Sequence, residues 1–276
     1  MWRGEVEPAL ELYTRALDLA ADEELREVIT IRKAEALIAA DQEGPEVSAL
    51  AQIVMRRRSP RHVYMAATVL LRRYSEKEDR RRAIFYGKIG RKAAAEMREP
   101  LARVSVLNGL GITLAADSDF DGAIAAFDEA LAALSLLDPH RDEVRSLRPS
   151  LVANLGGTKV VSGDVEDGIR LLEKSLPLLD EDYAVAEACL DLCLGYSELE
   201  KYDEAELFGR RALTLATKPR QIRNGNHLLA MIASRSGKHE QASQYFDVVA
   251  SFYPDFKNVK ELLLAVDLGA VVNWKA

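Results

Sequence analysis

The chain is poor in the residues that build most catalytic and metal sites. Only two cysteines and four histidines occur among its 276 residues. Cys189 and Cys193 stand four residues apart on a predicted helix, where disulfide geometry is rare, and we interpret them as small packing residues. No His or Cys follows them at metal-ligand spacing. The histidines have no Ser, Cys or carboxylate at a recognisable catalytic spacing, so no catalytic residue and no metal site is predicted.

Phosphate loops, membrane spans and β-strands are missing from the sequence as well. It has no GxxxxGK or GxGxxG motif. No apolar run approaches the roughly 20 residues of a membrane span, and the first residues, Met-Trp-Arg-Gly-Glu-Val-Glu, contain no signal-peptide core. No alternation of β-branched residues is long enough for a sheet. These absences predict a cytoplasmic all-α protein that is not an enzyme and carries no cofactor.

One segment imitates a calcium loop. Residues 117–122, Asp-Ser-Asp-Phe-Asp-Gly, open like an EF-hand loop, but the twelfth position is Asp128 instead of the bidentate Glu that such a loop needs. A helix would also have begun where the loop should still be curving. We therefore interpret the segment as a turn between two helices.

The most regular feature present is a trio of small or aromatic residues spaced by four and three positions. This spacing puts the three side chains on one stripe of a helix. Recognisable trios begin at Ala9, Ala83, Ala123, Gly168, Ala205 and Ala242. The intervals between these starts are 74, 40, 45, 37 and 37 residues, and a degenerate copy near Glu46 would halve the first. A period of about 35–40 residues predicts stacked helix pairs.

A second apolar segment precedes each trio at a similar distance. Before Ala123 stand Leu110-Gly111 and Leu114, with Phe120 beside the turn, and Pro254 follows the last trio where a helix must stop. This set resembles the tetratricopeptide repeat (TPR) family, whose signature is Leu-Gly in the first helix, an aromatic near the turn, and Ala, aromatic, Ala in the second. The resemblance covers nearly the whole chain and is strongest around residues 104–137 and loosest before residue 80.

The resemblance implies an all-α fold, a right-handed superhelical solenoid of antiparallel helix pairs with about 14 helices in a single domain, 1–276. The expected elements are a half repeat at 5–20, repeats at about 22–57, 60–96, 100–137, 140–178, 182–217 and 220–252, and a closing helix at 256–274. The trio residues Ala123, Phe127, Ala130, Ala205 and Ala242 should be buried.

Both ends of the predicted solenoid are unusual. The half repeat lacks its first helix, so either the chain is part of a longer protein or this end packs against a second copy. The closing helix is more apolar than one buried stripe requires, and it could fold over the last repeat or form a dimer interface. We expect a homodimer through these terminal helices.

Charge is unevenly distributed along the chain. Residues 55–103 contain 15 Lys or Arg and 5 Asp or Glu, whereas the whole chain has a net charge of −7. This basic segment could bind an acidic partner, nucleic acid or the acidic remainder of the chain, or it could be a solvated surface. Few aromatics suited to base stacking occur within it, so nucleic acid is the less favoured partner.

In TPR proteins the first helix of each repeat lines a concave groove that binds partner peptides. The resemblance places eight polar residues on that wall: Thr68, Arg72, Ser105, Asn108, Asn154, Asp191, Asn224 and His227. Asparagine offers both a donor and an acceptor, so it can bind a peptide backbone. The chaperone-binding Lys-Asn-Asn-Lys-Arg clamp of some TPR domains is not reproduced. We therefore expect a non-catalytic protein–protein interaction module. The alternative is the C-terminal sensor domain of a bacterial transcription regulator whose DNA-binding domain is absent from this chain.

Overall fold

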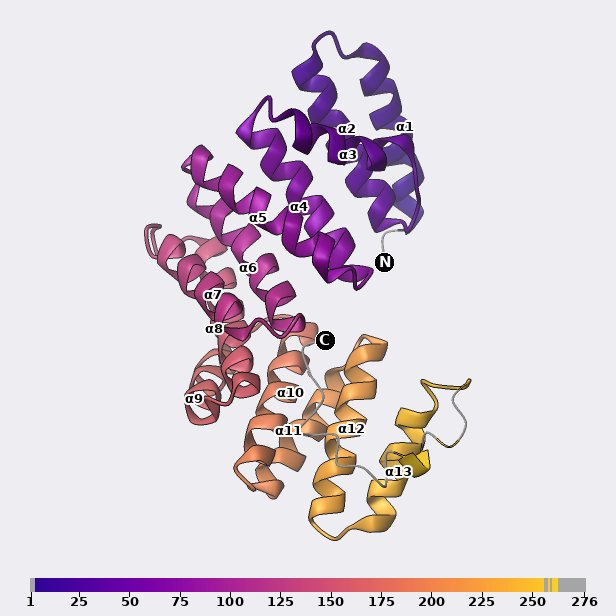
Figure 1. The fold of residues 1–276 in the computed structure, drawn as a ribbon, viewed down its shortest axis with the longest axis vertical. Helices are drawn as coiled ribbons and strands as arrows, with labels where there is room; N and C mark the ends of the chain where they lie inside the picture. The colour runs from indigo at the N-terminus through magenta and orange to yellow at the C-terminus, as the bar shows by residue number, and fades with distance from the viewer. Residues whose placement is uncertain (1–2, 256–257, 259, 263–276) are drawn as a thin grey trace. The chain divides into compact units, whose positions relative to one another are not determined.

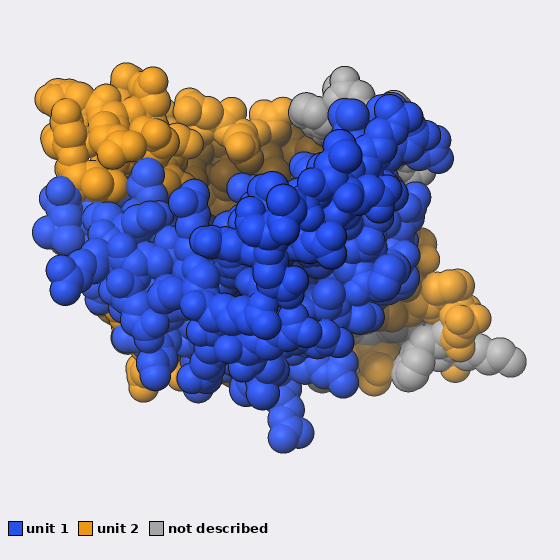
Figure 2. All heavy atoms as spheres, turned by 90° about the horizontal axis from the view of Figure 1, so that it is seen from above, with its two compact units in different colours: residues 1–117, 132–136 blue, residues 118–131, 137–276 orange. Residues whose placement is uncertain are grey.

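The computed structural model describes residues 3–255, 258 and 260–262, and every regular element among them is a helix (Figure 1). The predicted all-α fold is therefore confirmed. The chain divides into two compact units: unit 1 comprises residues 1–117 and 132–136, and unit 2 comprises residues 118–131 and 137–276 (Figure 2). The organisation of 1–276 as a single domain stays a prediction.

Unit 1 is built from helices that follow one another along the sequence: α1 (Arg3–Leu19), α2 (Glu23–Ala39), α3 (Pro45–Arg56), α4 (Pro60–Glu76), α5 (Arg80–Met97) and α6 (Pro100–Ala116). Each helix packs on the next one, and α4 also packs on α2 and α6. α1 occupies the half repeat expected at 5–20, and α2–α3 and α4–α5 occupy the next two expected repeats. Short turns join the helices of each pair, which run antiparallel (Figure 1).

Most of α7 (Phe120–Leu134) belongs to unit 2, and the remaining elements of that unit are α8 (Asp142–Ser162), α9 (Val165–Ser175), the 3₁₀ helix η1 (Leu176–Leu178), α10 (Asp182–Glu198), α11 (Tyr202–Leu215), α12 (Pro219–Arg235) and α13 (His239–Ala250). Here α10 packs on α8 and α12 as well as on its neighbours in sequence. Both units thus stack the first helix of one repeat on the first helix of the next.

Helix starts follow from local sequence. Proline opens four helices at or near the first position: Pro45, Pro60, Pro100 and Pro219. Proline is tolerated there because the first helical N–H groups have no intrahelical partner. At the start of α7, Asp119 Oδ1 accepts a hydrogen bond from the Gly122 N–H at 3.0 Å, and the Asp119 carbonyl accepts from the Ala123 N–H. The segment that imitates a calcium loop is thus a turn and helix cap, as predicted.

A residue in the left-handed conformation recurs once in each turn between the two helices of a pair. These residues are Asp41, Glu78, Ser118, Gly163, Glu200 and Gly237. Their intervals match those of the trios, so the turn is part of the repeat. At Glu200 the N–H donates to Ser197 O at 3.1 Å, and the next N–H, of Lys201, donates to Tyr196 O at 2.9 Å. This pair of bonds is the Schellman motif, which normally favours glycine.

Replacing Glu200 with glycine should raise the free energy of unfolding by about 1 kcal/mol, because the left-handed conformation strains a residue that has a Cβ. The matched change in the opposite direction is Gly163→Ala, where φ is +100° and no atom lies within 4 Å of a Cβ position. It should be destabilising through the backbone alone. Urea denaturation followed by circular dichroism measures both variants, and equal effects of the same sign would contradict the explanation.

The predicted trio residues form the interior. Ala123, Phe127, Ala130, Ala205 and Ala242 are all buried, as expected. In α1, by contrast, the trio beginning at Ala9 is only half-buried. Leu12 and Leu19 on the same helix are exposed.

The expected closing helix lies mostly outside the described residues. Residues 260–262 are helical, and the rest of the segment after residue 262 is not described. A homodimer through the terminal helices therefore stays a prediction. Within the described helices, none combines the length and apolarity needed to cross a bilayer.

The two cysteines and a glycine pair show how tightly unit 2 is packed. Cys189 and Cys193 are free, buried thiols, as predicted, and burial raises the pKa of Cys189 to about 11. Burial raises the pKa of Cys193 too. Where α8 meets α9, a Cβ at Gly168 would lie 2.6 Å from the backbone oxygen of Gly156 and 2.8 Å from the backbone nitrogen of Val160. Only glycine allows this approach.

Candidate functional site

Four of the eight predicted site residues line one groove in unit 1. The groove lies along the first helices of three successive repeats, α2, α4 and α6, and has a volume of about 520 Å³. α4 contributes Thr68 and Arg72, and α6 contributes Ser105 and Asn108. We call this cavity the α2–α4–α6 groove.

The repeat spacing explains why these side chains meet. Thr68 and Ser105 are 37 residues apart, and the position 37 residues before Thr68 is Ile31 on α2. In the same way, Glu35 precedes Arg72 by one repeat. Because the first helices stack in register, equivalent positions of successive repeats line the same groove.

An ion-pair cluster lies on the groove wall. Glu35 on α2 accepts from Arg32 Nη1 at 3.0 Å and from Arg72 Nη2 of α4 at 3.2 Å. All three side chains are partly exposed, so the cluster adds little to stability. It does hold the Arg72 guanidinium in place, and the guanidinium groups of Arg32 and Arg72 share the single carboxylate of Glu35.

The remaining lining combines apolar and hydrogen-bonding groups. Met65 of α4 and Ile112 of α6 contribute apolar surface. Thr68 Oγ1 donates to the Tyr64 carbonyl at 2.8 Å, and its oxygen can still accept. The groove can therefore take up apolar side chains while also bonding to a polar backbone.

The sequence analysis missed several residues of this groove. Extending the same helical stripes by one turn would have found two of them. Tyr64 lies one turn before Thr68, and Ile112 lies one turn after Asn108. Glu35 was missed because the predicted wall included no residue of α2.

The other four predicted residues lie in unit 2, on α8, α10 and α12, and three of them are almost buried. Asn154 on α8 is half-buried. Asp191 and Asn224 are 7% exposed and His227 is 9% exposed. The His227 ring packs edge-on against Phe246 of α13, with centroids 5.9 Å apart. These residues offer little surface to a partner, so the candidate site rests on the four residues in unit 1.

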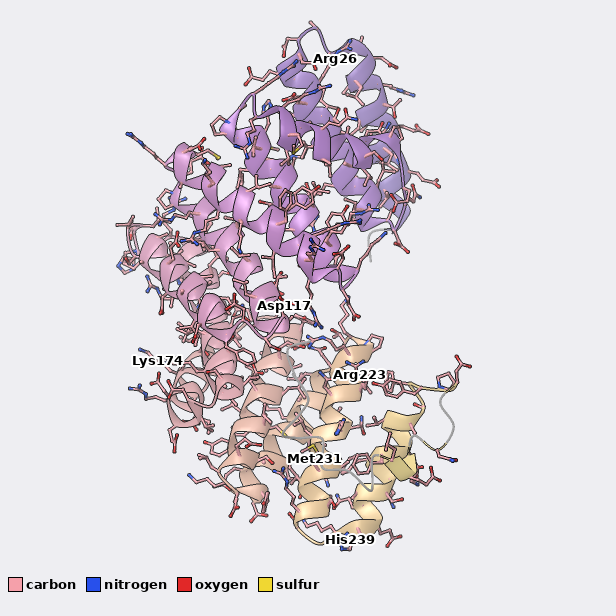
Figure 3. All side chains as sticks on the ribbon, viewed as in Figure 1. Arg26, Asp117, Lys174, Arg223, Met231 and His239 are labelled. Carbon is pink, nitrogen blue, oxygen red and sulfur yellow. The ribbon has the colours of Figure 1, made fainter. Side chains whose placement is uncertain are left out.

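Packing on α12 also engages Asn224. Its Oδ1 accepts a hydrogen bond from Arg223 Nε at 3.1 Å. Figure 3 labels Arg223 on α12. On the neighbouring first helix, α10, Glu187 pairs with Arg220 of α12 at 2.8 Å. Polar groups on this face of unit 2 therefore bond to one another, within α12 and between α10 and α12.

Part of the basic segment 55–103 is neutralised by acids of the preceding repeat. Arg72 pairs with Glu35, and both Arg73 and Lys77 pair with Glu43. Hydrogen bonds from Lys77 and Arg73 lower the pKa of Glu43. The interpretation that the segment meets acids of the same chain thus applies to some of its cations.

No protein-family model and no curated protein matches the chain. Several solved structures resemble it in fold. The apo form of the quorum sensor NprR from B. thuringiensis aligns with a TM-score of 0.69 and 14% identity over 96% of this chain and 81% of that one. A Rap protein complexed with competence and sporulation factor aligns with a TM-score of 0.67 and 15% identity over 96% and 79% of the two chains. A repeat protein from Parabacteroides merdae aligns with a TM-score of 0.60 and 14% identity over 95% and 92%. At these identities the similarity concerns the fold alone.

Proposed function

Because the chain has the fold of tetratricopeptide repeat proteins, we propose that it is a non-catalytic interaction module whose α2–α4–α6 groove binds a peptide segment of a partner protein. The observation that carries this proposal is the meeting of Thr68, Arg72, Ser105 and Asn108 on one cavity. The same four residues are among those that the TPR resemblance places on the concave wall.

The chemistry of the groove suits a peptide. Its volume of about 520 Å³ falls within the range of roughly 300–1,000 Å³ that is usual for ligand sites. Apolar surface from Met65 and Ile112 would take up a side chain, and Asn108 and Thr68 have side chains that can bond to a backbone. Arg32 and Arg72 share one carboxylate, which favours a segment with an acidic residue.

A displayed library of random peptides would test the groove. Peptides selected on the full chain should bind Asn108→Ala and Thr68→Ala less tightly. Each lost hydrogen bond costs about 0.5–1.5 kcal/mol, or up to about tenfold in affinity. Isothermal titration calorimetry measures the affinities, and thermal melting checks that each variant is folded.

Thr14→Ala is the matched control for Thr68→Ala. Both hydroxyls donate to the carbonyl four residues earlier at 2.8 Å, but Thr14 lies exposed on α1, outside the groove. Thr14→Ala should leave the affinity unchanged. If the selected peptides respond equally to both threonine variants, or to neither Thr68→Ala nor Asn108→Ala, the groove is not their binding site.

The second candidate is the sensor domain of a bacterial transcription regulator. It is supported by the fold similarity to the quorum sensor NprR over 96% of this chain. A sensor must change conformation when its peptide binds, whereas a scaffold need not. Hydrogen exchange with and without a selected peptide distinguishes the two: protection limited to α2, α4 and α6 favours the module, and changes beyond them favour the sensor.

Self-association and a cytoplasmic location remain parts of the proposal. The exposed Leu12 and Leu19 on α1 offer an apolar surface for a second copy. Light scattering across a concentration series measures the mass of the particle, and a constant monomer mass would remove the dimer from the proposal.

A further inference from the structure

A second cavity in unit 1 shares no lining residue with the α2–α4–α6 groove. It has a volume of about 250 Å³ and lies between the start of α4 and the second half of α5. Its apolar lining includes Val63 of α4 and Ile89 and Ala93 of α5. Phe85 forms part of the wall and remains 52% exposed. We call this cavity the α4–α5 pocket.

Cations surround this apolar pocket. Arg57, Lys88 and Lys92 line it together with a single acid, Glu96. Along α5, Phe85, Lys88 and Lys92 are spaced by three and four residues, so they lie on one helical stripe. The stripe presents two ammonium groups and one phenyl ring to solvent.

Unlike several other cations of the basic segment, such as Arg72 and Arg73, these three cations have no acidic partner among the described residues. Arg56 and Arg58, on either side of Arg57, both pair with Glu23. Within the part of the chain that the structure describes, no carboxylate lies within ion-pairing distance of Arg57, Lys88 or Lys92. The chain has 44 acidic residues, so this local excess of positive charge is not caused by a scarcity of acids.

The pocket is suited to one side chain. Its volume lies below the roughly 300–1,000 Å³ of typical small-molecule sites. A nucleic acid would need a row of aromatic platforms for its bases, whereas Phe85 is the one aromatic residue in the lining. Apolar walls ringed by unpaired cations fit an apolar side chain flanked by carboxylates.

We propose that the α4–α5 pocket docks an acidic polypeptide segment of a partner protein, which inserts one apolar side chain against Phe85, Val63 and Ile89. Carboxylates on either side of that anchor pair with Arg57, Lys88 and Lys92. This surface is separate from the groove, so the chain can hold two segments, of one partner or of two partners, at once.

Synthetic probes test this docking by fluorescence anisotropy with the full chain. The first probe is a labelled peptide of alternating Glu and Ser with one central Phe. The second replaces that Phe with Ser, the third replaces every Glu with Gln, and the fourth is an oligothymidylate of equal charge. The affinity of the first probe should be at least about tenfold higher than that of each other probe, because only the first probe supplies both the anchor and the carboxylates.

Variants locate the binding on the chain. Lys88→Glu should weaken the first probe about tenfold, and the effect should shrink at high salt. The matched control is Arg15→Glu, an equal charge change at an exposed position of α1, which should change the affinity less than about twofold. Phe85→Ala should weaken the first probe without changing the affinity for the Phe-free peptide. Thermal melting confirms folding, and Lys92→Glu replaces any variant that fails to fold.

Three outcomes would overturn the proposal. Equal binding of the oligothymidylate or the Phe-free peptide would mean that the surface is a general polyanion patch. Equal effects of Lys88→Glu and Arg15→Glu would place the binding elsewhere. No binding of the first probe to the wild-type chain at low salt would mean that the pocket is not a docking site.

Discussion

Replacing His62 with alanine should lower the free energy of unfolding of unit 1 by about 3–5 kcal/mol, because it leaves the buried carboxylate of Glu27 without its hydrogen-bond partner. His62 Nδ1 on α4 lies 2.8 Å from Glu27 Oε2 on α2. The two residues are only 3% and 6% exposed. The second carboxylate oxygen of Glu27 has no hydrogen-bond partner among the described residues, and the exposed Arg58 Nη1 lies 3.9 Å from it. Urea denaturation followed by circular dichroism measures the loss.

Two comparisons separate a buried partnership from simple loss of volume. The double variant Glu27→Leu with His62→Leu removes both polar groups and should recover most of the stability, since an apolar replacement of a buried pair is often neutral. The exposed pair of Arg210 and Glu206 provides the surface reference. Arg210→Ala should cost less than about 1 kcal/mol. If His62→Ala costs no more than Arg210→Ala, the pair is not a buried partnership.

Replacing Gly168 with alanine should destabilise unit 2 by about 1–3 kcal/mol, because the new methyl group overlaps the backbone of α8. The added Cβ would lie 2.6 Å from the Gly156 carbonyl oxygen, and a backbone atom cannot rotate away. An exposed glycine in a helix usually behaves in the opposite way, and its replacement by alanine gains about 0.5–1 kcal/mol. The sign of the change, measured by urea denaturation, therefore tests the close approach of α8 and α9.

Gly209→Ala is the graded control for this prediction. A Cβ at Gly209 would meet only side-chain atoms, of Leu229 at 2.8 Å and of Cys193 at 2.9 Å. Leu229 can change its rotamer, so this variant should lose less stability than Gly168→Ala. A larger loss at Gly209 would mean that backbone contact is not what restricts the α8–α9 crossing.

The trio of small and aromatic residues was sufficient to predict the fold. Its spacing requires a helix, and its small members require a second helix close by, so the period of the trio is also the period of the helix pairs. Gly168 is an example of this requirement, because no larger residue fits where α9 crosses α8. The segment after residue 262 was predicted from apolarity alone, and it lies outside the described residues.

The candidate site was predicted only in part, for a physical reason. A residue on the inner stripe of a first helix is expected to face the groove. Whether it is exposed there depends on how neighbouring side chains pack around it. Thr68 and Asn108 line a groove, whereas Asp191 and His227 lie on equivalent helices and are almost buried. A single sequence does not specify how closely two first helices approach each other.

The pairing of Glu27 with His62 escaped the sequence analysis, which found no partner for this histidine. The two residues are separated by 35 positions, and their motif is not a known one. Their separation is nearly one repeat, however, and the same is true of Glu35 with Arg72. A search for complementary polar residues one repeat apart would have found both pairs.

This one-repeat separation also limits how far a local disturbance can spread. Each helix has its partners in the same repeat or the next, so the interior is a series of layers and not a common centre. In such an arrangement the free energy of opening differs from layer to layer. A lesion at Glu27 should speed amide exchange in α2 and α4, and one at Gly168 should do so in α8 and α9, while amides two layers away keep their protection. Each layer then has its own free energy of opening, and a single melting temperature is an average over the layers.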